Sequence, residues 1–205
     1  MSNGIKVKKR NGRGTEALNL EKMHKMVEEA TKGIAGVSAS QVEIQSGIQF
    51  YDGITTAEIQ EILIKSASDL IDLDHPNYQF VAARLLLFSI RKSLYGRTRE
   101  LPHLEDHIIK TVNQEVYDAG IYDKYSKEDI EKANGYIDHD RDFLFTFAGL
   151  RQVVDKYLVQ DRSTGQVYET PQFMYMMIAL TIFAEYPKET RLNYCLLYTS
   201  PSPRD

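Results

Sequence analysis

The sequence has a single cysteine, no tryptophan and no long apolar run. Cys195 is the only thiol among 205 residues, which excludes an internal disulfide, a zinc site built on several cysteines and dithiol chemistry within this chain. No apolar stretch reaches the roughly 18 residues that a membrane-spanning helix needs. The first residues are charged and lack an apolar core, so no secretory signal is expected. These absences predict a soluble, intracellular and mainly helical protein.

The sequence also has no large excess of positive or negative charge. It contains 25 Lys and Arg and 29 Asp and Glu, which gives a formal net charge of −4. This balance excludes a strongly basic nucleic-acid coat, and 42% apolar residues exclude a disordered tail. We therefore expect neither a nucleic-acid nor a membrane partner. A chain of this length buries roughly 70% of its unfolded surface, enough for one large or two small cores.

Residues 1–96 have the pattern of one compact domain. Alternation over residues 5–10 predicts a short strand, and Asn11-Gly12 predicts a turn that returns the chain through residues 15–18. Four helices follow, each marked at its start by a capping residue or a proline: Asn19, Ser38, Thr55 and Pro76. Ser38 with Gln41 and Thr55 with Glu58 have the form of capping boxes. We expect a short β-hairpin and a four-helix bundle, closed by Gly96.

Residues 97–194 predict a second helical region with one β-hairpin. The hairpin is expected between Tyr157 and Tyr168, around Thr164-Gly165. Apolar periodicity predicts helices over residues 104–116, from 126 onward, over 140–156 and over 173–183.

The helical periodicity stops after Tyr194, and Pro201 and Pro203 are incompatible with a helix. The string from residue 195 to residue 205 resembles translated sequencing-adapter read-through. We expect this string to be no part of the natural fold and the natural chain to continue beyond Tyr194.

The best candidate for a binding site lies where the predicted hairpin meets the first helix. Lys9 ends the first strand, and Glu16, Asn19 and Lys22 surround the start of the helix. Free amides and a partial positive charge at a helix N-terminus, together with two lysines, would suit a triphosphate. Thr56, at another helix start, adds a hydroxyl and a second set of amides. On composition alone the alternative is favoured, namely that a basic hairpin is only a solvated surface.

Other clusters of polar residues have simpler explanations. The segment from Asp138 to Asp142 is dense in carboxylates, but acidic residues complement a helix N-terminus and Arg141 would oppose a cation. His103 and His107 lack the glutamate and third ligand of a metalloprotease helix, so we interpret them as surface or capping residues. The Walker, GxGxxG and GxSxG motifs do not occur. We expect no metal site and no catalytic residue in this chain.

Several segments resemble two neighbouring parts of one enzyme family. The first four, Lys-Val-Lys-Lys-Arg-Asn-Gly (6–12), Leu-Asn-Leu-Glu-Lys (18–22), Asp-Gly-Ile-Thr-Thr (52–56) and Pro-Asn-Tyr-Gln-Phe-Val-Ala-Ala-Arg-Leu (76–85), resemble an ATP-cone domain. Later segments resemble the region that follows the cone in the large subunit of aerobic class I ribonucleoside-diphosphate reductase. They are His-Asp-Arg-Asp (139–142), Lys-Tyr-Leu-Val (156–159), Thr-Gly-Gln-Val-Tyr-Glu-Thr-Pro-Gln-Phe-Met (164–174) and Tyr-Pro-Lys-Glu-Thr-Arg-Leu (186–192).

The resemblance implies a cytoplasmic enzyme, or one in the host cytoplasm if phage-encoded, that reduces ribonucleoside diphosphates to deoxyribonucleoside diphosphates by radical chemistry. In this family the large subunits form homodimers and hold the catalytic cysteines in an α/β barrel. A small diiron subunit supplies the radical, and thioredoxin or glutaredoxin restores the dithiol. The barrel and its cysteines match nothing here, so we expect the chain to be the catalytically inactive, regulatory N-terminal part of such a subunit.

The resemblance also implies an allosteric site for overall activity, where the family binds ATP as activator and dATP as inhibitor, with Mg²⁺ accompanying the nucleotide. The positions that match the family motif are Lys9, Arg10, Glu16, Ala17, Leu18, Asn19, Leu20, Glu21, Lys22, Thr56 and Lys92. Two departures stand out. Gln60 replaces a histidine that is common in inhibited members, and one residue is inserted around Arg13–Gly14. Both bear on inhibition by dATP more than on nucleotide binding.

Three other functions are weighed against this one. A nucleotide-sensing transcription repressor would carry a four-cysteine zinc ribbon ahead of the cone, and residues 1–6 have no room for it. An anaerobic glycyl-radical reductase has a different segment after its cone, which the stretch from residue 156 to residue 173 argues against. A basic interaction module remains if the resemblance to the cone is accidental.

Overall fold

The structure is a computed structural model that describes residues 5–9 and 14–199. It divides into two compact units, of which unit 1 is Met1–Ser89 with Phe143–Arg151 and unit 2 is Ile90–Asp142 with Gln152–Asp205. The predicted domain boundary after Gly96 falls just beyond the helix Tyr78–Tyr95, whereas the two units divide within this helix, between Ser89 and Ile90. Within the described ranges, no helix is long and apolar enough to cross a membrane.

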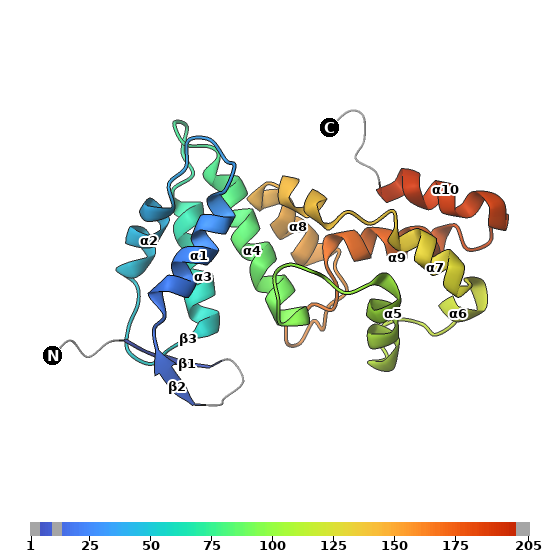
Figure 1. The fold of residues 1–205 in the computed structure, drawn as a ribbon, viewed down its shortest axis with the longest axis horizontal. Helices are drawn as coiled ribbons and strands as arrows, with labels where there is room; N and C mark the ends of the chain where they lie inside the picture. Colours follow the sequence, from blue (N-terminus) through green and yellow to red (C-terminus); the bar gives the residue numbers. More distant parts are fainter. Residues whose placement is uncertain (1–4, 10–13, 200–205) are drawn as a thin grey trace. The chain divides into compact units, whose positions relative to one another are not determined.

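Unit 1 consists of a small sheet and a set of helices (Figure 1). Its elements are β1 (Lys6–Lys8), β2 (Thr15–Ala17), α1 (Leu20–Thr31), α2 (Ala39–Gly47), β3 (Ile54–Thr55), α3 (Thr56–Asp69), the first part of α4 (Tyr78–Tyr95) and the first part of α8 (Phe147–Lys156). The strand order is β2-β1-β3, with β1 and β2 antiparallel and β1 and β3 parallel. The antiparallel pairing of β1 with β2 confirms the two predicted strands of the hairpin, whereas the predicted turn at Asn11-Gly12 lies outside the described residues. Strand β3 was not predicted because two residues are too few to show an alternating pattern.

Side-chain caps begin two of the first three helices, α1 and α3. Asn19 Oδ1 accepts a hydrogen bond from Lys22 N at 2.8 Å and so begins α1 as predicted. The predicted capping box of α3 is present, because Thr55 Oγ1 accepts from Glu58 N at 3.1 Å and the Glu58 carboxylate accepts from Thr55 N at 2.8 Å. Ser38 does precede α2, but its side chain makes no capping hydrogen bond, so that predicted capping box is wrong.

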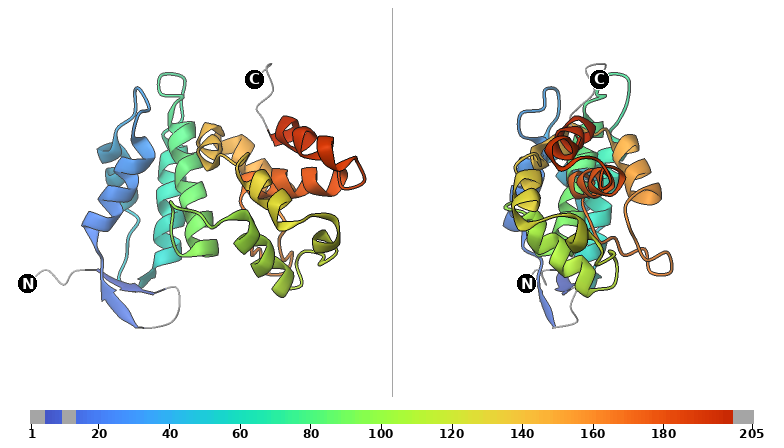
Figure 2. Two further views of the ribbon diagram at one scale, coloured as in Figure 1. Left: turned by 45° about the vertical axis from the view of Figure 1, so that its right-hand side comes forward. Right: turned by 90° about the vertical axis from the view of Figure 1, so that its right-hand side faces the viewer.

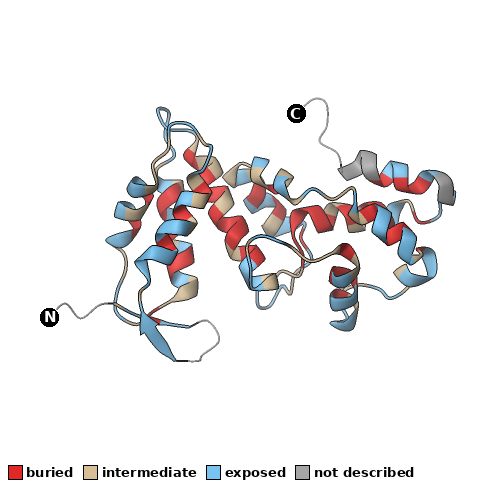
Figure 3. Ribbon diagram, in the orientation of Figure 1, coloured by how far each residue is buried: buried red, intermediate tan, exposed pale blue. Residues whose placement is uncertain are grey.

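The facing sides of the helices in unit 1 are buried (Figure 3). The fully buried aliphatic residues of this unit include Val27, Ala30, Val42, Ile54, Leu63, Val81 and Leu85. Each large aliphatic side chain contributes about 1.5–3 kcal/mol when it is buried. The sheet lies at the end of the unit where α1 and α3 begin, as the views in Figures 1 and 2 agree. The core thereby fixes the sheet against two helix N-termini.

Loss of the α3 capping box is expected to cost about 1 kcal/mol of unfolding free energy, because Thr55→Ala removes the acceptor for Glu58 N. Thr55→Ser keeps the oxygen and serves as the matched control. Urea denaturation of both variants checks this. Equal stability of the alanine variant and the parent chain would contradict it, as would a serine variant as weak as the alanine one.

Unit 2 is helical and is built around α9. Its elements are the end of α4, α5 (Leu104–Asn113), α6 (Ile121–Lys124), α7 (Lys127–Asn134), the 3-10 helix η1 (His139–Leu144, whose last two residues belong to unit 1), the end of α8 (Phe147–Lys156), α9 (Pro171–Ile182) and α10 (Lys188–Thr199). Its core contains Leu104, Ile108, Ile130, Phe173, Met176, Leu180 and Cys195. The helix predicted over residues 173–183 is α9, which begins two residues earlier with Pro171 in its first turn.

The single helix predicted over residues 140–156 is wrong. The 3-10 helix η1 ends at Leu144, and α8 begins at Phe147. Thr146 Oγ1 accepts a hydrogen bond from Gly149 N at 3.2 Å, which starts a new helix, and Asp142 is buried beside Arg91. The apolar pattern gave no sign of the break because it continues on both sides of it.

The predicted hairpin between Tyr157 and Tyr168 is reduced to a turn with one isolated bridge. Gln160 and Val167 form that bridge, and Tyr168 N donates to Val159 O at 3.0 Å. Gly165, with φ of 72°, provides the left-handed residue that the turn needs.

The helical pattern does not stop at Tyr194. Helix α10 runs to Thr199, and Cys195 is fully buried in the core of unit 2. The helix ends before Pro201, as the restriction on residues preceding a proline requires. The origin of residues 195–205 stays a prediction.

Candidate functional site

Three of the predicted site residues converge beside the sheet of unit 1. Lys9 Nζ lies 3.0 Å from Glu16 Oε2, and both side chains are more than two-fifths exposed. The pKa of Glu16 is lowered by its hydrogen bond with Lys9 and by the positive charges of Lys9 and Lys22. Two ammonium groups therefore act on one exposed carboxylate, which is an arrangement that a polyanionic ligand can enter by displacing Glu16.

The parallel pairing of β1 with β3 places Thr56 at the same edge as Lys9. Lys8 pairs with Thr55, and these are the last residues of the two strands. Lys9 follows β1, and Thr56 follows β3 as the first residue of α3. Since parallel strands end at the same edge, Lys9 leaves the sheet where the first amides of α3 begin. Thr56 was expected at this site from its position at a helix start, and the unpredicted strand β3 is what brings it beside Lys9.

Gln60 lies one helical turn after Thr56, with 4% of its surface exposed. Its Nε2 donates to Met26 Sδ at 3.2 Å, which joins α3 to α1. The residue that departs from the family pattern is therefore buried between the two helices whose N-termini flank the sheet.

A groove of about 710 Å³ opens beside the predicted segment 17–21. Four of the predicted residues line it, namely Ala17, Leu18, Leu20 and Glu21. The other lining residues were not predicted: Ile5, Met23, His24, Glu43, Ile44, Gly47 and Phe50. Glu43, Ile44 and Gly47 come from α2. They were not predicted because the apolar periodicity of one helix does not show which other helix it will pack against. A mainly apolar groove with a few polar groups suits a flat ring such as a base.

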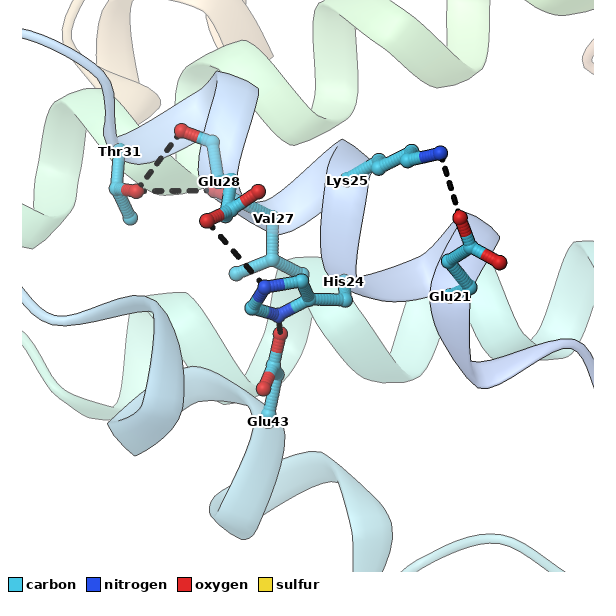
Figure 4. Close-up of polar contacts among 7 residues, drawn as sticks. All are labelled: Glu21, His24, Lys25, Val27, Glu28, Thr31 and Glu43. Atoms are coloured by element: carbon cyan, nitrogen blue, oxygen red, sulfur yellow. Dashed lines mark hydrogen bonds and ion pairs between the residues drawn. The ribbon is translucent and has the colours of Figure 1, made fainter.

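His24 fixes one wall of this groove by joining α1 to α2 (Figure 4). Its Nδ1 lies 2.7 Å from Glu43 Oε1, and its Nε2 lies 3.3 Å from Glu28 Oε1. The hydrogen bond with Glu43 is the main reason that the pKa of His24 is raised. On the same helix, Lys25 Nζ donates to Glu21 at 2.7 Å, so the carboxylate of Glu21 already has a basic partner.

Two predicted residues are not tied to the cluster. Lys92 lies exposed in the last turn of α4 and belongs to unit 2. Arg10 lies outside the described residues. Both therefore stay predictions.

The acidic segment before α8 is used for ion pairs. Asp142 Oδ2 lies 3.0 Å from Arg91 Nη2 in the interior of unit 2, and Asp138 Oδ2 lies 3.6 Å from Arg141 Nε. Burial raises the pKa of Asp142 to about 6, against the opposing effect of Arg91. Across the part of the chain that is described, no group of three His, Cys, Asp or Glu side chains could hold a metal ion.

His107 is not a surface or capping residue, and that interpretation is wrong for it. His103 does cap α5, accepting from Glu105 N at 3.3 Å, but His107 is fully buried and stacks on Phe173 with centroids 4.2 Å apart. Its ring nitrogens contact Tyr95 Oη at 3.3 Å and Tyr117 Oη at 3.2 Å. The spacing of four residues suggested that His103 and His107 share one surface. In the structure His103 lies at the start of α5, whereas His107 is buried against Phe173 of α9.

Comparison with known proteins accounts for both units. The profile of the ATP cone domain matches residues 5–93, and that of the ribonucleotide reductase all-alpha domain matches residues 143–200. The chain is 47% identical over 194 residues to ribonucleoside-diphosphate reductase 1 subunit alpha of Escherichia coli K12. The chain belongs to the ribonucleoside-diphosphate reductase alpha-subunit family.

Two other relatives agree. The alpha subunit of Haemophilus influenzae is 46% identical over 194 residues, and that of Enterobacteria phage T4 is 40% identical over 171 residues. The alignments cover 95% of this chain for the two bacterial subunits and 82% for the phage one. The chain spans about a quarter of the length of these relatives, at 25%, 25% and 22%.

Within this reductase subunit, the cluster of Lys9, Glu16 and Lys22 and the start of α3 both lie in the ATP cone. The described residues contain only the three short strands β1, β2 and β3, so no barrel is formed among them. Nucleotide recognition is the chemistry that the cone's exposed lysines and helix N-termini favour.

Proposed function

We propose that the ATP cone of this reductase subunit binds an adenine nucleotide, ATP or dATP, at the cluster of Lys9, Glu16 and Lys22 beside the start of α3. The observation that carries the proposal is the convergence of both lysines on Glu16 at the edge of the sheet where Thr56 begins a helix. Mg²⁺ would accompany the nucleotide and be bound through its phosphates.

Charge and shape divide the ligand between two neighbouring regions. The triphosphate is placed at Lys9, Lys22 and the start of α3, where the positive charges and the helix dipole favour it. The groove lined by Ala17, Leu18, Leu20, Glu21 and Phe50 is mainly apolar and would accept the base. Glu16 would then exchange its contact with Lys9 for a hydrogen bond to the sugar or base.

The nucleotide would control the activity of the full-length subunit, which reduces ribonucleoside diphosphates to deoxyribonucleotides for DNA synthesis. In this role the subunit would act in the cytoplasm as a homodimer, with a small diiron subunit as radical source and thioredoxin or glutaredoxin as reductant. A nucleotide regulates only through a difference in affinity between two states of the enzyme. Gln60 is buried next to Met26, at the position where inhibited members of the family commonly have histidine. With glutamine there, this chain would distinguish dATP from ATP less strongly than a member with histidine does.

Lys9→Ala is expected to weaken ATP binding by about 1.5–3 kcal/mol, because a charge-assisted contact with phosphate is lost and Glu16 is left without its partner. Isothermal calorimetry of the 205-residue chain should give micromolar affinity for the parent and a much weaker one for the variant. Lys65→Ala is the matched control, since Lys65 is also exposed and lies 2.7 Å from a carboxylate, that of Asp69. No heat with millimolar ATP, or equal affinity in Lys9→Ala, would contradict the proposal.

A further inference from the structure

Helix α2, which forms one wall of the groove in unit 1, is short and mostly exposed. Two of its nine residues are buried, namely Val42 and Ser46. Its start is joined to α4, because Ser38 N donates to the hydroxyl of Tyr78 at 2.9 Å. Its middle is joined to α1 through Glu43 and His24. Because a helix in a protein is stabilised mainly by packing, a helix with so little buried surface depends on such polar contacts for its position.

His24 stands between two carboxylates, one on its own helix and one on α2 (Figure 4). Its Nδ1 lies 2.7 Å from Glu43 Oε1, and its Nε2 lies 3.3 Å from Glu28 Oε1. Among the described residues, Glu43 and Glu28 are the charged groups that raise the pKa of His24, and partial desolvation opposes them. The other charged pair beside it on α1, Glu21 and Lys25, is joined at 2.7 Å. His24 is therefore the one basic group shared by two carboxylates in this cluster of five side chains.

The number of protons on His24 decides how many of these contacts are hydrogen bonds. An imidazolium ring has two N–H donors and can bond to both carboxylates at once. A neutral ring has one N–H donor, so its other nitrogen directs a lone pair at the second carboxylate and is repelled by it. Loss of the proton therefore weakens the contact with Glu43, the contact with Glu28 or both. The α2 wall is held in place best while His24 is protonated.

We infer that His24 is a positioning residue for nucleotide binding, which holds the α2 wall of the groove in place while both of its ring nitrogens carry protons. ATP binding would then tighten as His24 takes up a proton and weaken as the proton is lost. His24 acts through Glu43, which lines the groove together with Ile44 and Gly47 of the same helix. The inference rests on the proposed binding of the base in this groove and adds to it a dependence on one proton.

Calorimetry of the 205-residue chain with ATP between pH 6 and pH 9 tests the inference. His24→Gln keeps one donor for Glu43 but does not titrate. The affinity of the parent should fall about threefold more over this range than that of the variant, a modest effect because exposed ion pairs contribute little. Since the pKa of His24 is raised, the extra fall should lie above pH 6.5. The terminal phosphate of ATP, which titrates near pH 6, acts alike in both proteins.

His75→Gln is the control for this comparison. His75 is also an exposed histidine of unit 1, and its Nδ1 lies 3.1 Å from a carboxylate oxygen of Asp72. It is not among the residues that line the groove. The pH dependence of ATP binding should therefore be the same in His75→Gln and in the parent.

Linkage gives a second measurement, because a proton that strengthens nucleotide binding must be held more tightly when the nucleotide is bound. A threefold effect corresponds to a rise of about 0.5 in the pKa of His24 on saturation with ATP. Nuclear magnetic resonance of the imidazole ring measures this pKa in the free and the bound chain. Glu43→Gln removes the charge on α2 while Glu28 remains, so the rise should disappear in that variant.

The outcomes separate this inference from the proposed function. ATP binding with equal pH dependence in the parent and in His24→Gln would overturn the inference and leave the proposed function standing. A pKa of His24 that ATP leaves unchanged or lowers would do the same. A full rise that persists in Glu43→Gln would also overturn it, because His24 would then act on the nucleotide without α2. Absence of ATP binding at every pH would overturn both.

Discussion

Acidification from pH 6.5 towards pH 4 is expected to destabilise unit 2, and His107 is the main cause. The imidazole is fully buried, and burial lowers its pKa from 6.5 to about 3. As the pH falls, the unfolded chain therefore binds a proton on this histidine before the folded chain does. The free energy that neutral His107 contributes is complete above about pH 6.5 and is lost as the pH approaches 3.

The expected loss from His107 between pH 6.5 and pH 4 is about 3 kcal/mol, a large share of the stability of a typical domain. His139, whose pKa is lowered to about 4, acts in the same direction. Asp142, with its pKa raised to about 6, and Glu169, whose pKa is also raised, act in the opposite direction because their folded forms bind the proton first. The comparison with a variant at position 107 therefore isolates the histidine.

His107→Gln keeps a donor and an acceptor but does not titrate, so its urea stability should change less between pH 6.5 and pH 4 than that of the parent. His24→Gln is the control, because His24 is exposed and its pKa is raised, which gives it the opposite pH dependence. Nuclear magnetic resonance of the ring nitrogens should find His107 neutral at pH 5 with the proton on Nε2, because Tyr117 donates its own proton to Glu169 and so accepts from this nitrogen. A parent-like slope in His107→Gln, or a ring that titrates near pH 6.5, would show that the buried histidine is not responsible.

Asp142→Ala is expected to cost about 3–5 kcal/mol, because it leaves the guanidinium of Arg91 buried without its carboxylate. Arg91 is 2% exposed, donates to Asp142 at 3.0 Å and also donates to His139 O at 2.6 Å. At this exposure, water does not replace the lost carboxylate around the guanidinium. The single substitution therefore creates an uncompensated charge inside unit 2.

Replacing both partners should be much less harmful than replacing one. The double variant with Arg91→Met and Asp142→Leu removes both charges and fills a similar volume, so most of the loss in Asp142→Ala should be recovered. Urea denaturation at pH 7 of the parent, the single variant and the double variant measures this. A single variant within about 1 kcal/mol of the parent would mean that the ion pair adds little.

Local capping chemistry explains which parts of the fold the sequence could predict. Asn19 and Thr55 each bind an amide within three residues, so the start of α1 and the start of α3 follow from neighbouring residues alone. The break between η1 and α8 has one local signal, the hydrogen bond from Gly149 N to Thr146 Oγ1, which the continuing apolar pattern concealed. Its other part could not be predicted locally, because Asp142 pairs with Arg91, which lies 51 positions away in the sequence.

The candidate site likewise has residues that the sequence could predict and residues that depend on how the helices pack. The resemblance and the spacing both named Lys9, Glu16 and Lys22, and the structure brings these three together. The α2 wall of the groove, with Glu43 and Ile44, depends on how two helices pack, which no single-helix pattern records. The buried chain of hydrogen bonds from Tyr95 through His107 and Tyr117 to Glu169 was missed for a similar reason, because its members are polar residues that find partners only after folding.

We propose that the cone binds nucleotide at the edge of the sheet formed by Lys9, Lys22 and the start of α3. Titration of the isotopically labelled 205-residue chain with ATP, followed through the amide chemical shifts, measures this for each residue. The largest shifts are expected at Lys9, at residues 16–22 and at Thr56, and they should saturate together with one affinity. Absence of shifts with millimolar ATP, or shifts confined to unit 2, would contradict it.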